Sequence, residues 1–146
     1  LQKFAKAIMN DQPIDIYNQG NHLRDFTYID DIIEGTWKVL QKPALSNFDW
    51  NSKIPDPATS VAPYRIYNIG NNKPVLLLDY IKALEISLGR KAKKKLFPLQ
   101  PGDIPDTFAH VDDFIKEFSF KPSMSIEQGV ENFVLWYKNY NNIESL

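Results

Sequence analysis

The stretch RDFTYIDDIIEGTWKVL, residues 24–40, changes its residue pattern part-way along. Residues 24–28 predict a short strand, because they include aromatic and β-branched residues. Asp30 is expected to cap a helix over residues 31–41, and the apolar residues that share one face of that helix are Ile32, Ile33, Trp37 and Leu40. The stretch therefore predicts a strand-to-helix junction, and its charges beside aromatic rings also suit a site for an anion.

The rest of the chain continues this mixture of helices and strands. Further helices are predicted over residues 1–10, 74–89 (after a short extended start), 112–118 and 125–140, and further extended segments over residues 14–17, 65–70, 93–99 and 107–111. Residues 43–63 form a long loop with four prolines, which either covers a site or is a tolerated surface insertion. The order predicts one small mixed α/β domain over residues 1–146.

Composition excludes several classes of function. The net charge of −1 gives no electrostatic footprint for nucleic acid or for an anionic membrane, and the apolar runs are too short to span a bilayer. The chain has no cysteines, so disulfides and thiolate metal sites are excluded and a cytoplasmic location is expected. His22 and His110 have no metal-ligand spacing, so no metal site is predicted.

Motifs for cofactor binding and catalysis are missing from these residues. The glycines stand at positions 20, 35, 70, 89, 102 and 129, which form neither a GxGxxG fingerprint nor a P-loop. No GxSxG, HExxH or Tyr-x-x-x-Lys pattern occurs. We therefore predict no catalytic residue and no cofactor-binding residue within this chain.

Four residues have the chemistry of a nucleotide site. Tyr17 offers an aromatic face beside a turn, and Arg24 offers a planar cation suited to phosphate oxygens. Gln100 and Asp103 bracket a Pro-Gly turn and offer acceptors for ribose hydroxyls. Each residue alone is explained better by packing, by a surface ion pair or by turn formation, and only their joint arrangement favours a nucleotide. The run RKAKKK, residues 90–95, is either a basic patch or a charged edge strand.

Four motifs resemble the C-terminal part of extended short-chain dehydrogenase/reductases, the NAD-dependent nucleotide-sugar epimerases and dehydratases. They occur in the expected order, and they are PIDIYNQGNHLRDFTYIDDIIEGTWKVL, YRIYNIGNNKPVLLLDYIKALEISLG, LQPGDIPDTFAHVDD and FKPSMSIEQGVENFVLWY. The segment DWNSKIPDPATSVAPYRIYNIGN together with PLQPGD is most similar to the UDP-glucuronate 4-epimerase branch.

This resemblance implies a fold and a reaction. The family has a large N-terminal Rossmann domain and a smaller C-terminal substrate domain, and this chain resembles only the latter. The NAD loop and the catalytic Tyr-x-x-x-Lys are then expected in an N-terminal half, in agreement with a chain that starts inside an amphipathic helix. The complete enzyme is expected to be a homodimer that interconverts UDP-glucuronate and UDP-galacturonate, with NAD taking and returning the C4 hydride.

The resemblance also implies roles for particular residues. Asp15 and Tyr17 match the segment that holds uracil, and Arg24 matches the arginine that binds the diphosphate. Gln100 and Asp103 match the segment that contacts ribose and phosphate. Many relatives carry arginine where Gln100 stands, so one phosphate contact is expected to be weaker or replaced.

Three further positions come from the same resemblance. Leu1 matches a position beside the nucleotide, and Thr107 falls near the position that gates the sugar pocket. His110 departs from the pattern, because relatives usually carry aspartate there.

Other functions agree with the same residues. One is another nucleotide-sugar dehydratase or decarboxylase of the superfamily, and a second is a non-catalytic module that binds nucleotide sugars. The chain alone is expected to be inactive. Its expected partners are a UDP-sugar substrate and the Rossmann domain of the same protein.

Overall fold

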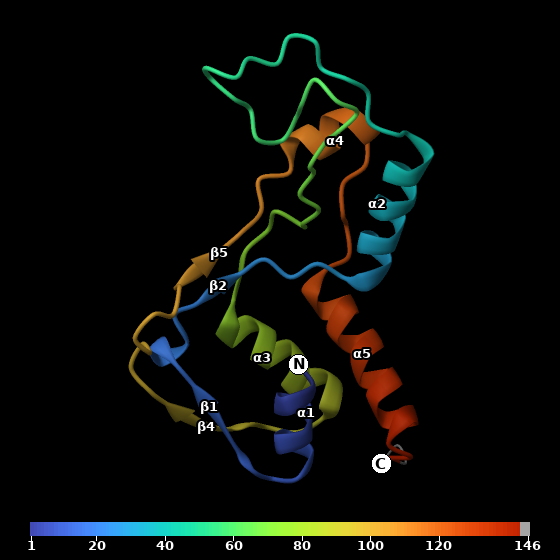
Figure 1. Ribbon diagram of the computed structural model, residues 1–146. Coiled ribbons are helices and arrows are strands. Elements are labelled where there is room, and N and C mark those ends of the chain that lie inside the picture. Colours follow the sequence, from blue (N-terminus) through green and yellow to red (C-terminus); the bar gives the residue numbers. More distant parts are fainter. Residues whose placement is uncertain (144–146) are drawn as a thin grey trace. The chain divides into compact units, whose positions relative to one another are not determined.

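The computed structural model describes residues 1–143 and shows a mixed α/β chain (Figure 1). The α/β class predicted from the sequence is confirmed. The chain divides into two compact units. Unit 1 contains residues 1–26, residues 73–108 and the C-terminal segment from Met124, and unit 2 contains residues 27–72 and 109–123.

Unit 1 combines helices with short strands. Its helices are α1 (Gln2–Met9), α3 (Leu77–Leu88) and α5 (Ile126–Tyr140), and its strands are β1 (Pro13–Ile16), β2 (Leu23–Arg24), β3 (Val75–Leu76), β4 (Lys93–Leu96) and β5 (Asp106–Thr107). A short 3₁₀ turn, η1 (Asn18–Gly20), connects β1 towards β2. Helix α3 packs against α5, and α1 packs against β1 and α3 (Figure 1).

The strands of unit 1 form two small sheets. Strand β1 pairs in parallel with β4, from Pro13 opposite Lys93 to Ile16 opposite Leu96. In the other sheet β2 lies between β3, which is antiparallel to it, and β5, which is parallel to it. The register places Arg24 beside Thr107. Segments far apart in the sequence are therefore neighbours in space.

The core of unit 1 explains why these elements form. In β1 burial alternates, so that Ile14 and Ile16 face the core while Pro13 and Asp15 are exposed. The apolar faces of the helices cover them, and the buried helical residues include Ala5, Ile8, Ile81, Leu84, Leu88, Val130, Val134 and Tyr137. A strand with one buried face leaves its other face free for a ligand.

Capping residues mark two helix ends in unit 1. Helix α3 ends at Gly89, whose φ of 69° lies in the left-handed region that glycine adopts without strain. Ser125 caps α5, and its side-chain oxygen accepts a hydrogen bond from the Gln128 backbone N–H at 3.2 Å. These ends were predictable because capping chemistry depends only on neighbouring residues.

Unit 2 contains helix α2 (Ile29–Gln41), helix α4 (Asp112–Phe118) and the long loop. Gly35 of α2 approaches Phe114 and Ile69 closely, and Tyr67 lies edge-on to Phe114 with ring centroids 6.0 Å apart. By contrast, the predicted apolar face of α2 is largely exposed, with Ile33, Trp37 and Leu40 each at least 59% accessible. The contacts of α2 within unit 2 therefore lie on its glycine side.

Three predictions about elements in or next to unit 2 are wrong in detail. Strand β2 ends at Arg24 instead of residue 28, because its partners β3 and β5 pair with it only at Leu23 and Arg24. Helix α2 has Tyr28 at its N-cap position, and Asp30 and Asp31 lie in the first turn, where carboxylates favour the helix dipole. Residues 65–70 form no strand, because only an isolated bridge from Thr59 to Arg65 pairs with them.

The helices are short and carry charged residues. None within residues 1–143 is both long enough and apolar enough to cross a bilayer.

The buried carboxylate of Glu85 ties α3 to the start of β4. Its Oε1 accepts hydrogen bonds from the Ala92 backbone N–H at 2.9 Å and from Lys94 Nζ at 2.8 Å, and Lys91 Nζ lies 3.6 Å from Oε2. Burial alone raises the pKa of the Glu85 carboxyl, but the hydrogen bonds from Lys94 and Ala92 and the charges of Lys94 and Lys91 outweigh it, so the pKa lies below its ordinary value.

We expect Glu85→Gln to lower the free energy of unfolding at neutral pH by about 1.5–3 kcal/mol, the range of a hydrogen bond to a charged group. A lowered folded-state pKa stabilises the protein above the unfolded pKa, and this contribution is lost as the pH falls through the folded pKa. The difference between wild type and variant in urea unfolding should therefore shrink in acid. Glu34→Gln, which breaks only an exposed pair with Lys38, is the control. A difference that stays constant with pH would contradict this account.

Candidate functional site

Arg24 and Asp103 lie together in unit 1. The Arg24 guanidinium donates from NH1 to the Pro105 carbonyl at 2.6 Å and to the Leu23 carbonyl at 3.1 Å. Its NH2 lies 3.5 Å from Oδ1 of Asp103. Both side chains are partly accessible, at 28% for Arg24 and 33% for Asp103. The structure thus brings together two residues that the sequence predicted separately as a phosphate contact and a ribose contact.

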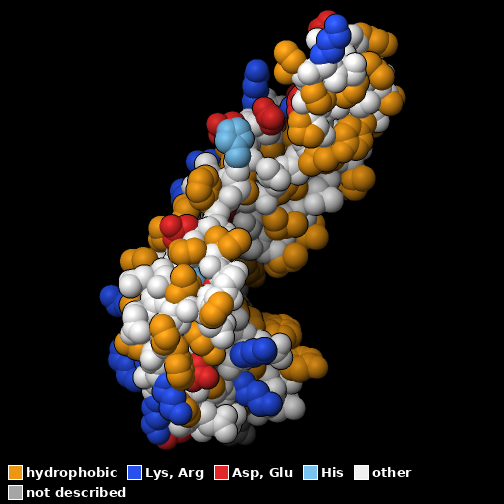
Figure 2. All heavy atoms as spheres, turned by 60° about the vertical axis from the view of Figure 1, so that its left-hand side comes forward, with side chains coloured by type: hydrophobic (Ala, Val, Ile, Leu, Met, Phe, Trp, Pro, Cys, Tyr) orange, Lys and Arg blue, Asp and Glu red, His pale blue; other side chains and the backbone are white. Residues whose placement is uncertain are grey.

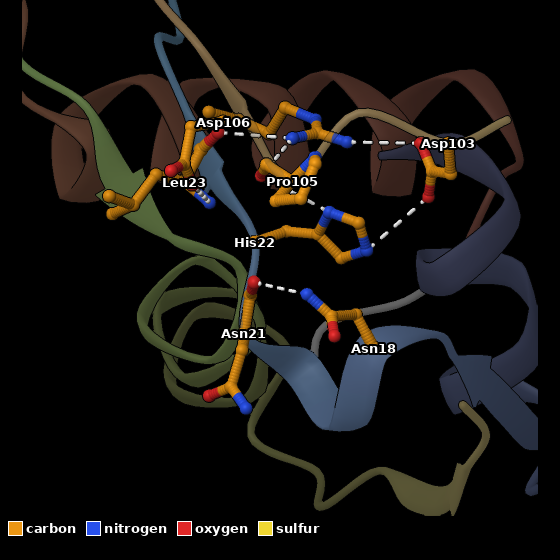
Figure 3. Close-up of polar contacts among 8 residues, drawn as sticks. Asn18, Asn21, His22, Leu23, Asp103, Pro105 and Asp106 are labelled. Atoms are coloured by element: carbon orange, nitrogen blue, oxygen red, sulfur yellow. Dashed lines mark hydrogen bonds and ion pairs between the residues drawn. The ribbon is translucent and has the colours of Figure 1, made fainter. Parts of the chain in front are cut away.

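His22 forms the buried side of this cluster. The ring Nε2 lies 3.3 Å from Oδ2 of Asp103, and Nδ1 lies 3.2 Å from the Pro105 carbonyl oxygen (Figure 3). His22 is only 3% exposed. Sequence reasoning considered this histidine only as a metal ligand and missed its position. The sequence carries no strand signal for it, because His22 stands before β2 and outside the strand predicted over residues 24–28.

The loop before β5 carries Gln100, Asp103 and Pro105. The Asp103 backbone N–H donates to the Gln100 carbonyl at 3.1 Å across a tight turn, in which Gly102 has a φ of 83°. The Gln100 side chain is exposed. Leu23 N–H donates to the Pro105 carbonyl at 3.1 Å, which fastens this loop to β2. The loop is therefore held so that Asp103 faces His22 and Arg24.

The exposed face of the β1–β4 sheet carries the other predicted residues. Asp15 stands opposite Lys95 in the parallel register, and both are exposed. Tyr17, just after β1, stacks on Phe97, with ring centroids 5.4 Å apart and planes 30° apart. Phe97, which sequence reasoning did not select, comes directly after β4. The aromatic rings of Tyr17 and Phe97 thus lie on the same sheet face as Asp15 and Lys95. Figure 2 shows Lys and Arg side chains gathered around this part of unit 1.

A turn with left-handed backbone, residues 18–20, lies between Tyr17 and Arg24. Asn18, Gln19 and Gly20 have φ values of 51°, 53° and 85°. Left-handed backbone costs roughly 1–2 kcal/mol for each residue that has a Cβ. Asn18 offsets part of this cost, because its Nδ2 donates to the Asn21 carbonyl at 2.6 Å (Figure 3). The turn fixes the direction in which the chain leaves the aromatic pair and enters β2.

Two predicted residues lie at the margin of this arrangement. Thr107 is exposed in β5 and is the register partner of Arg24. Leu1 occupies the N-cap position of α1, is 42% exposed, and its carbonyl accepts the Ala5 N–H at 3.0 Å. The described contact of Leu1 is therefore with its own helix and not with Arg24 or Asp103.

Two features singled out in the sequence belong to unit 2. His110 is exposed and lies 3.3 Å from Asp112 at the start of α4, and nothing in the structure explains why a histidine stands there. The loop over residues 43–63 is closed by its own contacts, such as Trp50 Nε1 donating to the Asp56 carbonyl at 3.0 Å. Asn47 Nδ2 also donates to Thr59 Oγ1 at 3.2 Å.

The cluster presents one cation and one carboxylate, and both are partly exposed. Arg24 has donors left over beyond its contacts with Pro105 and Asp103, because a guanidinium carries five N–H groups. Within residues 1–143, no group of three or more His, Asp or Glu side chains could hold a metal ion. The cluster therefore offers cation and acceptor groups for a polar ligand.

The chain is similar to known proteins over most of its length. Residues 1–70 match the NAD dependent epimerase/dehydratase family. Protein CapI of Staphylococcus aureus is 52% identical over 140 residues, which cover 96% of this chain and 42% of that protein. This chain therefore resembles part of an NAD-dependent epimerase/dehydratase. UDP-glucuronate 4-epimerase 1 of Arabidopsis thaliana is 37% identical over 141 residues, covering 94% of this chain and 32% of that protein.

Solved structures of this family have the same fold. UDP-glucuronic acid 4-epimerase from Bacillus cereus, solved with UDP-glucuronic acid and NAD, aligns with a TM-score of 0.71 and 28% identity. The alignment covers 94% of this chain and 38% of that one. dTDP-glucose 4,6-dehydratase from Bacillus anthracis aligns with a TM-score of 0.73 at 18% identity, which shows the fold alone. The chain thus spans less than half the length of these epimerase/dehydratase proteins.

Proposed function

We propose that this chain supplies the substrate-binding part of an NAD-dependent UDP-sugar 4-epimerase that interconverts UDP-glucuronate and UDP-galacturonate. The observation that carries the proposal is the Arg24–Asp103 cluster, a partly exposed cation and carboxylate held on neighbouring segments of unit 1. The sequence identity to UDP-glucuronate 4-epimerases, one of which was solved with UDP-glucuronic acid, also supports the proposal.

Each part of the nucleotide has a candidate partner. The uracil ring would contact Tyr17, with Asp15 on the same exposed face of β1, and the diphosphate would bind the fork of Arg24. Ribose hydroxyls would donate to Asp103 and meet the amide of Gln100. Thr107, next to Arg24 in the sheet, would border the sugar, and Leu1 would lie beside the nucleotide.

NAD does not fit the residues of this chain. The glycines form no pyrophosphate-binding motif, and Gly20 and Gly35 instead make close contacts with side chains of the chain itself. We therefore assign NAD to a Rossmann domain that acts together with this chain. The exposed apolar face of α2 supports such a partner, because large apolar side chains there have no cover within unit 2. This chain's share of the reaction is to hold the UDP group, which confines the sugar to one position.

Product analysis tests the proposed reaction. The intact protein is incubated with NAD and UDP-glucuronate, and the nucleotide sugars are separated by chromatography. Formation of UDP-galacturonate, together with the reverse reaction, is the expected result. A UDP-pentose with release of carbon dioxide would show a decarboxylase. A dehydratase would instead be shown by a parallel incubation with a hexose substrate that has a 6-hydroxyl, such as dTDP-glucose, if it yields a 4-keto-6-deoxy sugar. Binding of UDP-sugar without any turnover would show a non-catalytic module.

A further inference from the structure

We propose that His22 is a positioning residue that holds one oxygen of Asp103, so that Arg24 can exchange Asp103 for the diphosphate of the substrate. The inference rests on the proposed function, since it concerns how the same UDP site is prepared. Asp103 is bound from two sides, by His22 Nε2 at Oδ2 and by Arg24 NH2 at Oδ1.

The two contacts of Asp103 differ in burial. His22 is 4% exposed at its side chain, whereas Arg24 is 28% exposed. The contact with His22 is thus shielded from water, and the contact with Arg24 is open to solvent and to a ligand. A diphosphate that binds Arg24 has to compete with Oδ1 of Asp103, because both are acceptors for the same guanidinium.

His22 makes this exchange easier for an electrostatic reason. Without a donor at Oδ2, the Asp103 carboxylate would depend on Arg24 alone and would oppose an incoming diphosphate more strongly. With Oδ2 held by the ring, Oδ1 is free to turn from Arg24 to a ribose hydroxyl when the diphosphate binds. The carboxylate of Asp106 lies next to the cluster, where its Oδ1 accepts the Leu23 N–H at 3.3 Å (Figure 3).

The His22 ring contacts two acceptors, the Pro105 carbonyl oxygen and Oδ2 of Asp103. Only Asp103 relies on His22 for this contact. The Pro105 carbonyl oxygen already accepts from Arg24 NH1 at 2.6 Å and from the Leu23 N–H at 3.1 Å. It therefore has partners for both of its lone pairs without the histidine. Oδ2 of Asp103, in contrast, has its described contact with Nε2 of His22 (Figure 3).

This difference between the two ring nitrogens gives a pair of matched variants. The glutamine amide reaches about as far as Nε2 and can donate to Asp103, whereas the shorter asparagine amide reaches about as far as Nδ1 and cannot. We expect His22→Gln to keep the affinity for UDP. His22→Asn and His22→Leu should each raise the Kd for UDP about tenfold, as expected for one hydrogen bond to a charged group.

The experiment is calorimetric titration of the intact protein with UDP. The other histidine, His110, supplies the control variant His110→Gln, which should bind like wild type because it lies in unit 2. In an Asp103→Asn background, His22→Leu should no longer change the Kd, because the carboxylate on which His22 acts has been removed. In steady-state kinetics His22→Leu should raise the KM for the UDP-sugar and leave kcat at saturation unchanged.

The outcomes separate this inference from the proposed function. Wild-type protein that does not bind UDP would overturn the proposed function and the role of His22 with it. If the wild type binds UDP, three results would each overturn the role of His22 alone. These are unchanged affinity in His22→Asn, an equal loss in His22→Gln, and a full effect of His22→Leu in the Asp103→Asn background. The two amide variants keep a polar side chain, so their comparison holds even where leucine lowers the stability.

Discussion

Replacing Arg24 by alanine is expected to weaken UDP binding by about 1.5–3 kcal/mol, the range of a hydrogen bond between charged groups. The guanidinium is partly exposed, and it is held in place by the Pro105 and Leu23 carbonyls, so little side-chain freedom remains to be lost when a phosphate binds. Calorimetric titration of the intact protein with UDP measures the change.

Two further variants make the Arg24 result specific. Arg24→Lys keeps the charge but loses the fork, and is expected to recover only part of the affinity. Arg90→Ala is the control, since Arg90 donates to the Met9 carbonyl at 3.1 Å and belongs to no part of the cluster. Unchanged UDP affinity in Arg24→Ala, with a loss of thermal stability only, would reduce Arg24 to a structural ion pair.

Replacing Gly20 by alanine is expected to lower the free energy of unfolding by about 2–4 kcal/mol. Two costs add here. Gly20 has a φ of 85°, which is strained for a residue with a side chain, and a Cβ would lie 2.7 Å from Cγ and Cδ2 of Leu78. Because the turn at Gly20 leads from Tyr17 to Arg24, the variant should also bind UDP less tightly. Urea unfolding followed by circular dichroism measures the stability.

The two costs at Gly20 can be separated experimentally. Gly89→Ala is the matched control, because Gly89 also has a positive φ, at 69°, but a Cβ there would meet nothing within 4 Å. It should cost only the backbone strain of about 1–2 kcal/mol. Combining Gly20→Ala with Leu78→Ala should recover the steric part, since the side chain of Leu78 is the neighbour that a Cβ meets. Equal losses in Gly20→Ala and Gly89→Ala would contradict the packing argument.

Features set by neighbouring residues could be predicted from the sequence. The end of α3 at Gly89 and the start of α5 after Ser125 depend on local backbone and side-chain chemistry, and both lie within one residue of the ends predicted for the helices over residues 74–89 and 125–140. The start of α2 was placed too late, because carboxylates suit the first helical turn as well as the cap position. The strand predicted for residues 65–70 failed because an alternating pattern does not supply a strand to pair with.

The candidate site depends on contacts that the sequence does not encode locally. Asp103 reaches Arg24 and His22 only because β5 pairs in parallel with β2, across about 80 residues of chain. The sequence showed that the residue types suit a nucleotide, but it did not show that Asp103 would compete with a phosphate for Arg24. Nor did it select Phe97, which reaches Tyr17 through the pairing of β4 with β1.

Mapping the binding of UDP onto the chain tests the central claim most directly. The intact protein, labelled with ¹⁵N, is titrated with UDP, and the changes in the backbone amide signals are assigned to residues. We predict that the largest changes lie in two segments of unit 1, residues 14–24 and 100–107, with the Arg24 amide among them. Changes confined to unit 2, or no change at saturating UDP, would contradict the assignment of the substrate site to this chain.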